Sequence, residues 1–171
     1  GRCRLPMPGR HNALNALAVI VLLTRLGFPF ASIAAGLGSF EGVKRRQQVR
    51  GVAGGVTVVD DFAHHPTAVR ETLQALRLAW PDSRLVVVFE PRTNSSRRAV
   101  FQDDYAGVFG DADRTLIREH VPLDTVPAEE QFSSRRLAED LRARGLDAKS
   151  YADTDAILDA LANSCRSGDV V

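Results

Sequence analysis

The chain has 171 residues and carries 22 Lys and Arg against 21 Asp and Glu, a formal net charge of +1. This balance excludes a global electrostatic attraction to nucleic acid or to a membrane surface, and the longest apolar run, 16–23, is too short to span a bilayer. The hydrophobic fraction of 44% is ordinary for a globular protein. The two cysteines, Cys3 and Cys165, indicate no disulfide framework and favour a reducing, cytoplasmic location.

The opening segment, up to Arg46, is predicted to be helical. A helix over 11–26 is apolar on most of its sides, for example at Leu14 and Leu17, so we expect it to be buried. A shorter helix is predicted over 31–37 and ends at a glycine.

From Gln47 onward the pattern changes to alternating strands and helices. The predicted strands are 49–52, 56–59, 85–89, 114–117, 148–151 and the start of another at 169–171, and the predicted helices are 66–80, 99–109, 134–144 and 154–163. The residues expected to face inward on these helices are Val69, Leu73, Leu76, Trp80, Leu137, Leu141, Ile157, Leu158 and Leu161. This alternation predicts an α/β fold with a mostly parallel sheet, helices on both faces and an antiparallel hairpin strand at the edge.

The two patterns predict two domains, 1–46 and 47–171. The first residue is not methionine, and the last three, 169–171, have the pattern of a strand that has only begun. We therefore expect a fragment of a longer protein.

Two carboxylates and two imidazoles stand where the strand 56–59 is followed by a helix. They are Asp60, Asp61, His64 and His65, and a proline at position 66 suits the first turn of the helix. Ligands of open α/β sheets collect at this edge, and the helix start offers N–H groups that suit phosphate. The structural alternative is an acid that caps the helix ahead of Pro66, together with a partly buried imidazole. Adjacent histidines diverge and no third ligand is evident, so no metal site is predicted.

A second polar loop follows the strand 85–89. Its sequence, EPRTNS, offers Arg92 as a bidentate partner for a carboxylate or phosphate, and Thr93 and Asn94 as groups that orient a ligand. If both strands are parallel, this loop and the first one emerge at the same sheet edge and converge on one pocket. A proline-containing turn with a solvated arginine is the alternative.

Asn12 and Asn15 lie three residues apart on one face of an otherwise apolar helix. An amide offers both a donor and an acceptor, which matches the edge of adenine; a helix cap and a satisfied interface amide are the alternative. The basic run 44–46 can meet polyphosphate or can be a solvated charge run.

Together these segments resemble the Mur ligase superfamily. The helix opening GRHNALNALA, the basic run KRR and the motif DDFAHHP carry the resemblance, and VKRR, DDFAHHP and EPRTN are most similar to its murein peptide ligase branch. The resemblance implies a Rossmann-like C-terminal domain over 47–171, preceded over 1–46 by the helical end of a central ATPase domain. The sequence departs from the family pattern at Gln47, where the family usually has an apolar residue.

The activity that the resemblance implies is ATP-dependent amide formation through an acyl phosphate. The tripeptide L-Ala-γ-D-Glu-meso-diaminopimelate would be joined to UDP-N-acetylmuramate in peptidoglycan recycling, with Mg²⁺ and with the help of the N-terminal and central domains. Asn12 and Asn15 would hold adenine and Arg46 the terminal phosphate. Asp61 and His64 would face the nucleotide, and the incoming peptide would be contacted by Arg92 and Asn94.

Two alternatives stay open at this point. One is a ligase that adds L-alanine to UDP-N-acetylmuramate, and the other is a non-catalytic nucleotide-binding module. The 171 residues alone are expected to have no ligase activity.

Overall fold

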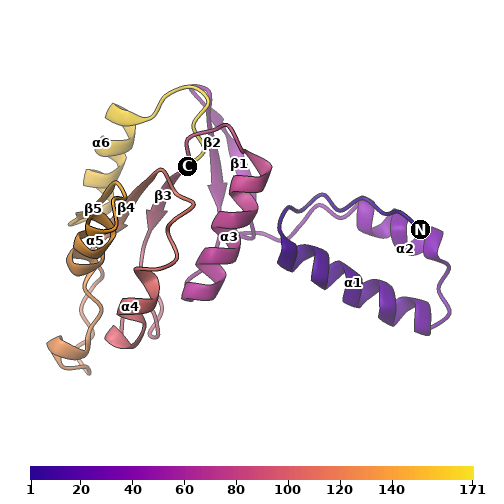
Figure 1. The fold of residues 1–171 in the computed structure, drawn as a ribbon, viewed down its shortest axis with the longest axis horizontal. Coiled ribbons are helices and arrows are strands. Elements are labelled where there is room, and N and C mark those ends of the chain that lie inside the picture. The colour runs from indigo at the N-terminus through magenta and orange to yellow at the C-terminus, as the bar shows by residue number, and fades with distance from the viewer.

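Two parts of different architecture make up the chain in the computed structural model, which describes all 171 residues. The helices α1 (Arg10–Arg25) and α2 (Phe30–Gly38) lie side by side, away from the rest of the chain (Figure 1). We call residues 1–46 the helical leader and residues 47–171, which contain every strand, the α/β body. The two leader helices and the two strands of the hairpin follow the predicted ranges to within about one residue at each end.

The strands of the α/β body form one hairpin and one parallel group. Strands β1 (Gln48–Ala53) and β2 (Val56–Asp60) pair antiparallel around the turn at the two glycines 54 and 55. Strands β3 (Val86–Phe89), β4 (Arg114–Arg118) and β5 (Ala148–Tyr151) pair in parallel, in the order β3–β4–β5.

The last three residues join these two groups into a continuous sheet. Val170 forms parallel bridges to Thr57 on one side and to Leu85 on the other. The N–H of Val59 donates to Val171 O at 2.7 Å, and the N–H of Val86 donates to Val170 O at 2.8 Å. The spatial order is therefore β1, β2, the segment 169–171, β3, β4, β5, with only β1 antiparallel. This confirms the predicted fold class and the predicted strand at 169–171.

Helices cover both faces of this sheet (Figure 1). The longer ones are α3 (Pro66–Ala79), α5 (Ser134–Ala143) and α6 (Thr154–Ser164); α4 (Gln102–Tyr105) and the 3₁₀ turns Ala99–Phe101 and Ala128–Glu130 are short. Ile117 packs with α3, α4 and α5 in the main core, whereas its neighbour Leu116 packs with Ile157 of α6 in a second one. Successive strand residues point to opposite faces, so the continuous apolar strands require both layers.

Three predictions about packing and helix length are wrong in detail. Helix α1 is not buried, because Leu14 and Leu17 are about half exposed and only Asn12 and Ala16 on this helix are buried. The predicted helix 99–109 is a 3₁₀ turn followed by the four residues of α4. Gly107 then closes a tighter turn on Asp104, since glycine is a poor helix former.

The third difference is in α6, where Leu158 is exposed rather than inward. Ile157 and Leu161 are one turn apart on the face that packs on the sheet, and Leu158 lies one position around the helix from that face. No helix in the chain combines the length and the apolar composition that a membrane crossing requires.

Candidate functional site

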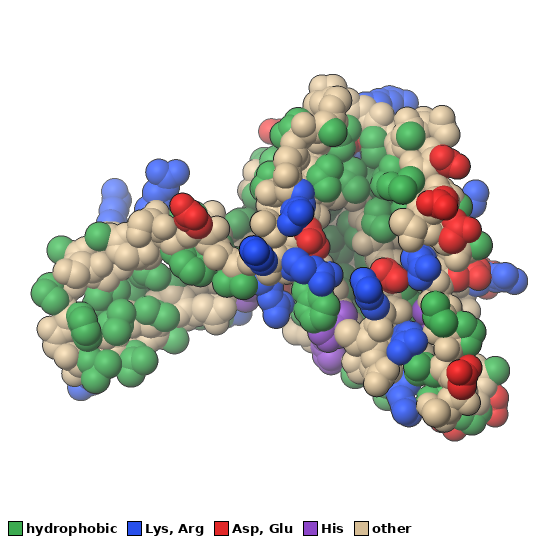
Figure 2. All heavy atoms as spheres, turned by 180° about the vertical axis from the view of Figure 1, so that it is seen from behind, with side chains coloured by type: hydrophobic (Ala, Val, Ile, Leu, Met, Phe, Trp, Pro, Cys, Tyr) green, Lys and Arg blue, Asp and Glu red, His purple; other side chains and the backbone are tan.

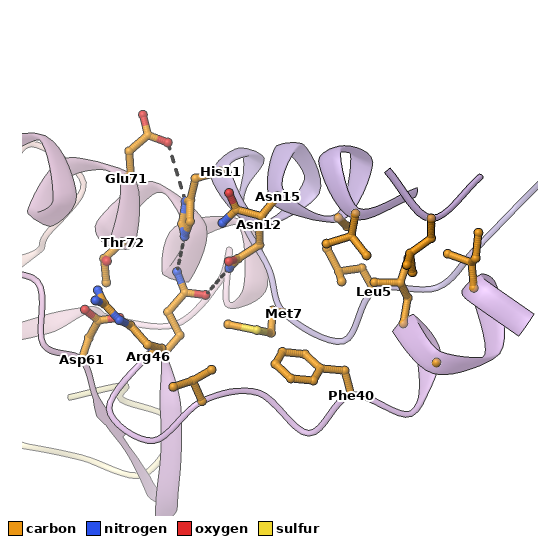
Figure 3. Close-up of a pocket in the computed structure, with 18 of the residues that line it drawn as sticks. Leu5, Met7, His11, Asn12, Asn15, Phe40, Arg46, Asp61, Glu71 and Thr72 are labelled. Carbon is orange, nitrogen blue, oxygen red and sulfur yellow. Dashed lines mark hydrogen bonds and ion pairs between the residues drawn. The ribbon is translucent and has the colours of Figure 1, made fainter. Parts of the chain in front are cut away.

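A cavity of about 900 Å³ lies between the helical leader and the first part of the α/β body (Figure 3). Its apolar end is lined by Leu5, Met7, Val19, Leu23, Ile33 and Phe40. Its polar end is lined by His11, Asn12, Asn15, Arg46, Gln47, Asp61, Glu71 and Thr72. These polar residues come from α1, from the junction between the two parts, from the end of β2 and from α3. The cavity therefore brings together four of the seven residues that the sequence placed in a site.

The junction that leads into β1 is held by the carboxylate of Asp61. Arg45 and Gln47 have φ angles of 59° and 50°, in the left-handed region that side chains rarely adopt. Asp61 Oδ2 accepts from the N–H of Gln47 at 2.8 Å and Oδ1 accepts from the N–H of Ala63 at 2.6 Å. Both carboxylate oxygens thus accept hydrogen bonds from backbone N–H groups, and Asp61 fixes the turn from which Arg46 projects.

Arg46 is the basic residue of this turn that lines the cavity. Its guanidinium is exposed and takes part in no side-chain hydrogen bond or ion pair, whereas Arg45 lies 3.6 Å from Asp60 and stacks over Phe62 at 4.9 Å. On the face seen in Figure 2, Lys and Arg side chains gather where the leader meets the body. A free guanidinium beside a cavity is suited to a phosphate or a carboxylate.

The two asparagines of α1 have different surroundings. Asn12 is 9% exposed, and its Nδ2 donates to Pro8 O at 2.7 Å and to Gln47 Oε1 at 3.3 Å. Asn15 is exposed, lines the same cavity and makes no side-chain hydrogen bond. Asn12 therefore fixes the leader to the junction, and Asn15 has its full donor and acceptor capacity free.

The hydrogen bonds of Asn12 continue to residues that sequence reasoning missed. Gln47 Nε2 lies 3.3 Å from His11 Nε2, and His11 Nδ1 lies 3.7 Å from Glu71 Oε2 of α3 (Figure 3). His11 Nδ1 is buried and has no hydrogen-bond partner. The one sequence feature that pointed to these contacts was Gln47, a polar residue at a position where the resembled family usually has an apolar one.

His64 and His65 lie outside the lining of this cavity. His65, and not an acid, caps α3, since its Nδ1 accepts from the N–H of Thr67 at 3.3 Å. His64 Nδ1 lies 2.9 Å from Phe62 O, and the carbonyl of His64 accepts from the Tyr105 hydroxyl. Burial raises the pKa of Tyr105, which keeps that hydroxyl a donor. His64 is thus held by its own loop and not beside Asp61 in the cavity.

The loop of Arg92 and Asn94 is also separate from the cavity. Asn94 Oδ1 accepts from Arg97 at 2.9 Å, and Arg92 is exposed without a side-chain partner. Glu90 pairs with Arg118, at the end of β4, at 3.0 Å. The loop does emerge at the same sheet edge as Asp61. The strands β2 and β3 are nevertheless not neighbours, because the segment 169–171 lies between them, and the prediction that both loops line one pocket is wrong for the cavity described here.

The side chains of this chain do not form a magnesium site. No group of three or more His, Cys, Asp or Glu side chains is placed to hold a metal ion. Mg²⁺ needs near-octahedral oxygen coordination, and both oxygens of Asp61 already accept backbone hydrogen bonds.

The fold and the cavity together define a class of protein. An open, mostly parallel sheet carries a polar cavity at the carboxyl end of a strand, which is where α/β domains bind their ligands. Residues 45–171 match the family model described as Mur ligase, glutamate ligase domain. The chain therefore belongs to the Mur ligase family.

Its relatives are ligases of larger size. The chain is 41% identical to a UDP-N-acetylmuramate–L-alanine ligase from Geobacter sulfurreducens, and the match covers 100% of this chain and 37% of that protein. A UDP-N-acetylmuramate–alanine ligase structure from Thermotoga maritima matches 98% of the chain with a TM-score of 0.79 and 26% identity, over 35% of its own length. A murein peptide ligase structure from Psychrobacter arcticus matches 98% of the chain with a TM-score of 0.68 and 29% identity, over 34% of its length. The chain spans just over a third of each of these relatives.

Proposed function

We propose that this chain is the C-terminal part of an ATP-dependent ligase that forms an amide between UDP-N-acetylmuramate and L-alanine. The supporting observation is the cavity between the two parts of the chain, in which the free amide of Asn15 on α1 and the free guanidinium of Arg46 at the end of the helical leader face one space. Two of the relatives named above are described as ligases of UDP-N-acetylmuramate and alanine. The cavity suits a purine nucleoside triphosphate, and the descriptions of the relatives indicate the two substrates that are joined.

The two parts of the chain have separate roles in this proposal. The helical leader is the end of a central ATPase domain, and the α/β body is the C-terminal domain. Asn12 and Asn15 face the adenine and Arg46 meets the terminal phosphate. Asp61 holds the junction from which Arg46 projects. His64, at the sheet edge, faces the nucleotide only after the body moves over the leader, as lids of multidomain enzymes do.

The reaction proceeds in two balanced steps. ATP transfers its terminal phosphoryl group to the muramate carboxylate, which gives an acyl phosphate and ADP. The amine of the second substrate then attacks the acyl carbon, and the tetrahedral intermediate collapses to the amide and inorganic phosphate. A guanidinium at the position of Arg46 stabilises the negative charge that develops on the phosphoryl oxygens.

The decisive experiment is a substrate panel with the complete ligase polypeptide. We expect ADP release that depends on UDP-N-acetylmuramate and on free L-alanine. Release that depends on neither substrate would contradict the proposal. The same assay on the 171 residues alone should show no amide product, because the leader and body supply only part of the relatives' length.

A second candidate acceptor is the tripeptide L-Ala-γ-D-Glu-meso-diaminopimelate. The loop 90–94 resembles that of murein peptide ligases, and one such enzyme is among the structural relatives. Arg92 is exposed at this loop, where it can meet a peptide carboxylate. If the panel shows turnover with tripeptide and none with L-alanine, the protein is a recycling enzyme of the cytoplasm.

A further inference from the structure

The carbonyl of Pro8 determines how the amide of Asn12 is turned. A backbone carbonyl only accepts hydrogen bonds, so the group that lies 2.7 Å from it is the NH₂ group of Asn12. The second proton of this NH₂ group is directed to Gln47 Oε1 at 3.3 Å. Both donors of Asn12 are therefore engaged, one by Pro8 and one by Gln47.

The remaining polar atom of Asn12 is the acceptor Oδ1. It takes part in no hydrogen bond, and it is not among the buried unpartnered atoms, so it is open to the cavity that Asn12 lines. Gln47 is itself held in place, because its N–H donates to Asp61 and its Nε2 lies against His11 Nε2. The cavity thus meets a fixed acceptor at Asn12 and no donor there.

A fixed acceptor discriminates between purine bases, whereas a free amide does not. Adenine presents an amino group at position 6, and guanine or hypoxanthine presents a carbonyl oxygen there. Asn15 is exposed and unpaired, so its amide can turn to suit either base. Asn12 cannot turn without placing its oxygen against Pro8 O, and an oxygen facing an oxygen is unfavourable.

We propose that Gln47 is a specificity-determining residue: by engaging the second proton of Asn12, it makes the cavity select a purine with an amino group at position 6. This inference rests on the proposed function, since it concerns the nucleotide that drives the ligase. Without the Gln47 carboxamide, Asn12 presents a free N–H beside its oxygen, and a 6-oxo base gains a donor.

The test compares ATP with inosine triphosphate as the driving nucleotide in the complete ligase. Gln47→Leu removes the polar group at similar volume, and it should lower the ratio of kcat/KM for ATP over inosine triphosphate by about tenfold, the size of one neutral hydrogen bond. KM for ATP itself should change by less than about threefold, because the acceptor of Asn12 stays in place. Gln47→Glu keeps an oxygen opposite Asn12 and should retain the ratio within about twofold.

Two further variants serve as a control and as an independent test of the same role. Gln74→Leu makes the same exchange at an exposed position of α3 outside the cavity and should leave the ratio unchanged. Gln47→Gly suits the positive φ of 50° and removes the side chain, so it gives the same reading if leucine disturbs the junction.

The outcomes separate this inference from the proposed function. An unchanged ratio in Gln47→Leu and Gln47→Gly, or equal rises of both KM values, overturns the role of Gln47. A wild-type ligase that uses both nucleotides equally well also overturns it, and leaves the ligase activity standing. A wild-type protein with no nucleotide-driven turnover overturns the proposed function together with this inference.

Discussion

The helical leader and the α/β body differ in what covers their apolar side chains. In the leader, Leu17 and Leu22 are 54% and 60% exposed, and the two helices bury little beyond Asn12, Ala16 and Ile33. In the body, Leu137 and Leu141 are fully buried within a core of sixteen buried residues. The difference shows that the body has an internal core, whereas the leader is joined to it by a polar junction.

The largest effect is expected from a matched pair of leucine substitutions. Leu141→Ala should lower the free energy of unfolding by about 3 kcal/mol, because it leaves a cavity in the body's core. Leu22→Ala should change it by less than about 0.5 kcal/mol, since that side chain is mostly exposed. Urea unfolding of the 171-residue chain, followed by circular dichroism, measures both. Equal losses would mean that the leader shares the body's core.

The next effect concerns the ion pair that holds the last strand segment in the body's sheet. Asp169 is nearly buried and lies 2.7 Å from Arg84, whose hydrogen bond lowers the pKa of that carboxyl. Asp169→Asn should lower the free energy of unfolding at neutral pH by about 2 kcal/mol, allowing for the partial exposure of Arg84.

The same carboxyl sets a pH dependence with a defined sign. Its pKa is lower in the folded chain than in the unfolded one, so its stabilisation is present above the ordinary Asp value and is lost as the pH falls through the folded value. The pKa of Asp113 is also lowered: burial opposes this, and hydrogen bonds from Leu85 N–H and Arg77 outweigh it. Stability should therefore drop below about pH 4, less steeply in Asp169→Asn. A wild-type curve with no acid slope would contradict this.

A smaller effect should separate the two asparagines of the leader. Asn15→Ala should weaken ATP binding to the complete ligase by about tenfold without changing its melting temperature, because the Asn15 amide has no partner within the chain. Asn12→Ala should weaken ATP binding too, because it removes the acceptor for the adenine amino group, and it should also lower the melting temperature, since it leaves Pro8 O and Gln47 Oε1 without their donor. Calorimetric titration and thermal melts give both readings. If Asn15→Ala leaves ATP affinity intact, Asn15 has no role in the adenine site.

The smallest effect is expected at the loop of the body that lies outside the cavity. Arg92→Ala should raise KM for the amine substrate by about fivefold, a value reduced by the exposure of the guanidinium. KM for ATP should stay unchanged, because the loop does not line the cavity. Steady-state kinetics with both substrates varied measures this, and Arg98→Ala, at another exposed position of the loop region, is the control. Parallel rises in both KM values would argue against the assignment.

Most of the body's fold could be predicted from sequence, because its signals are local. The stripe Val69, Leu73 and Leu76 is buried as the helical spacing predicted. The valine-rich runs became strands, and the segment 169–171, predicted as the start of a strand, pairs with Thr57 on one side and Leu85 on the other. The prediction of a helix over 99–109 was wrong, because the low helix propensity of Gly107 outweighed the apolar spacing around it.

The candidate site was predictable only in part, because its residues are distant in sequence. Asn15 could be singled out by residue type and spacing, and Arg46 by the resemblance of the basic run 44–46 to the family; both line the cavity. His11 and Glu71 could not, since their approach depends on how α1 lies against α3. Arg92 was placed with Asp61 on the assumption that β2 and β3 are neighbours, whereas the segment 169–171, from the far end of the chain, lies between them.

The sequence by itself determined the order of most strands and helices along the chain and the polar residue types that gather in the cavity. These follow from hydrophobic periodicity, turn residues and side-chain chemistry, all of which act over a few residues. Only the tertiary structure decided that Asp61 accepts hydrogen bonds from the backbone and that Gln47 accepts one from Asn12. It also decided that His64 and Arg92 lie outside the cavity. Hydrogen bonds have one geometry and each donor one principal partner, so their allocation is settled only when distant segments come together.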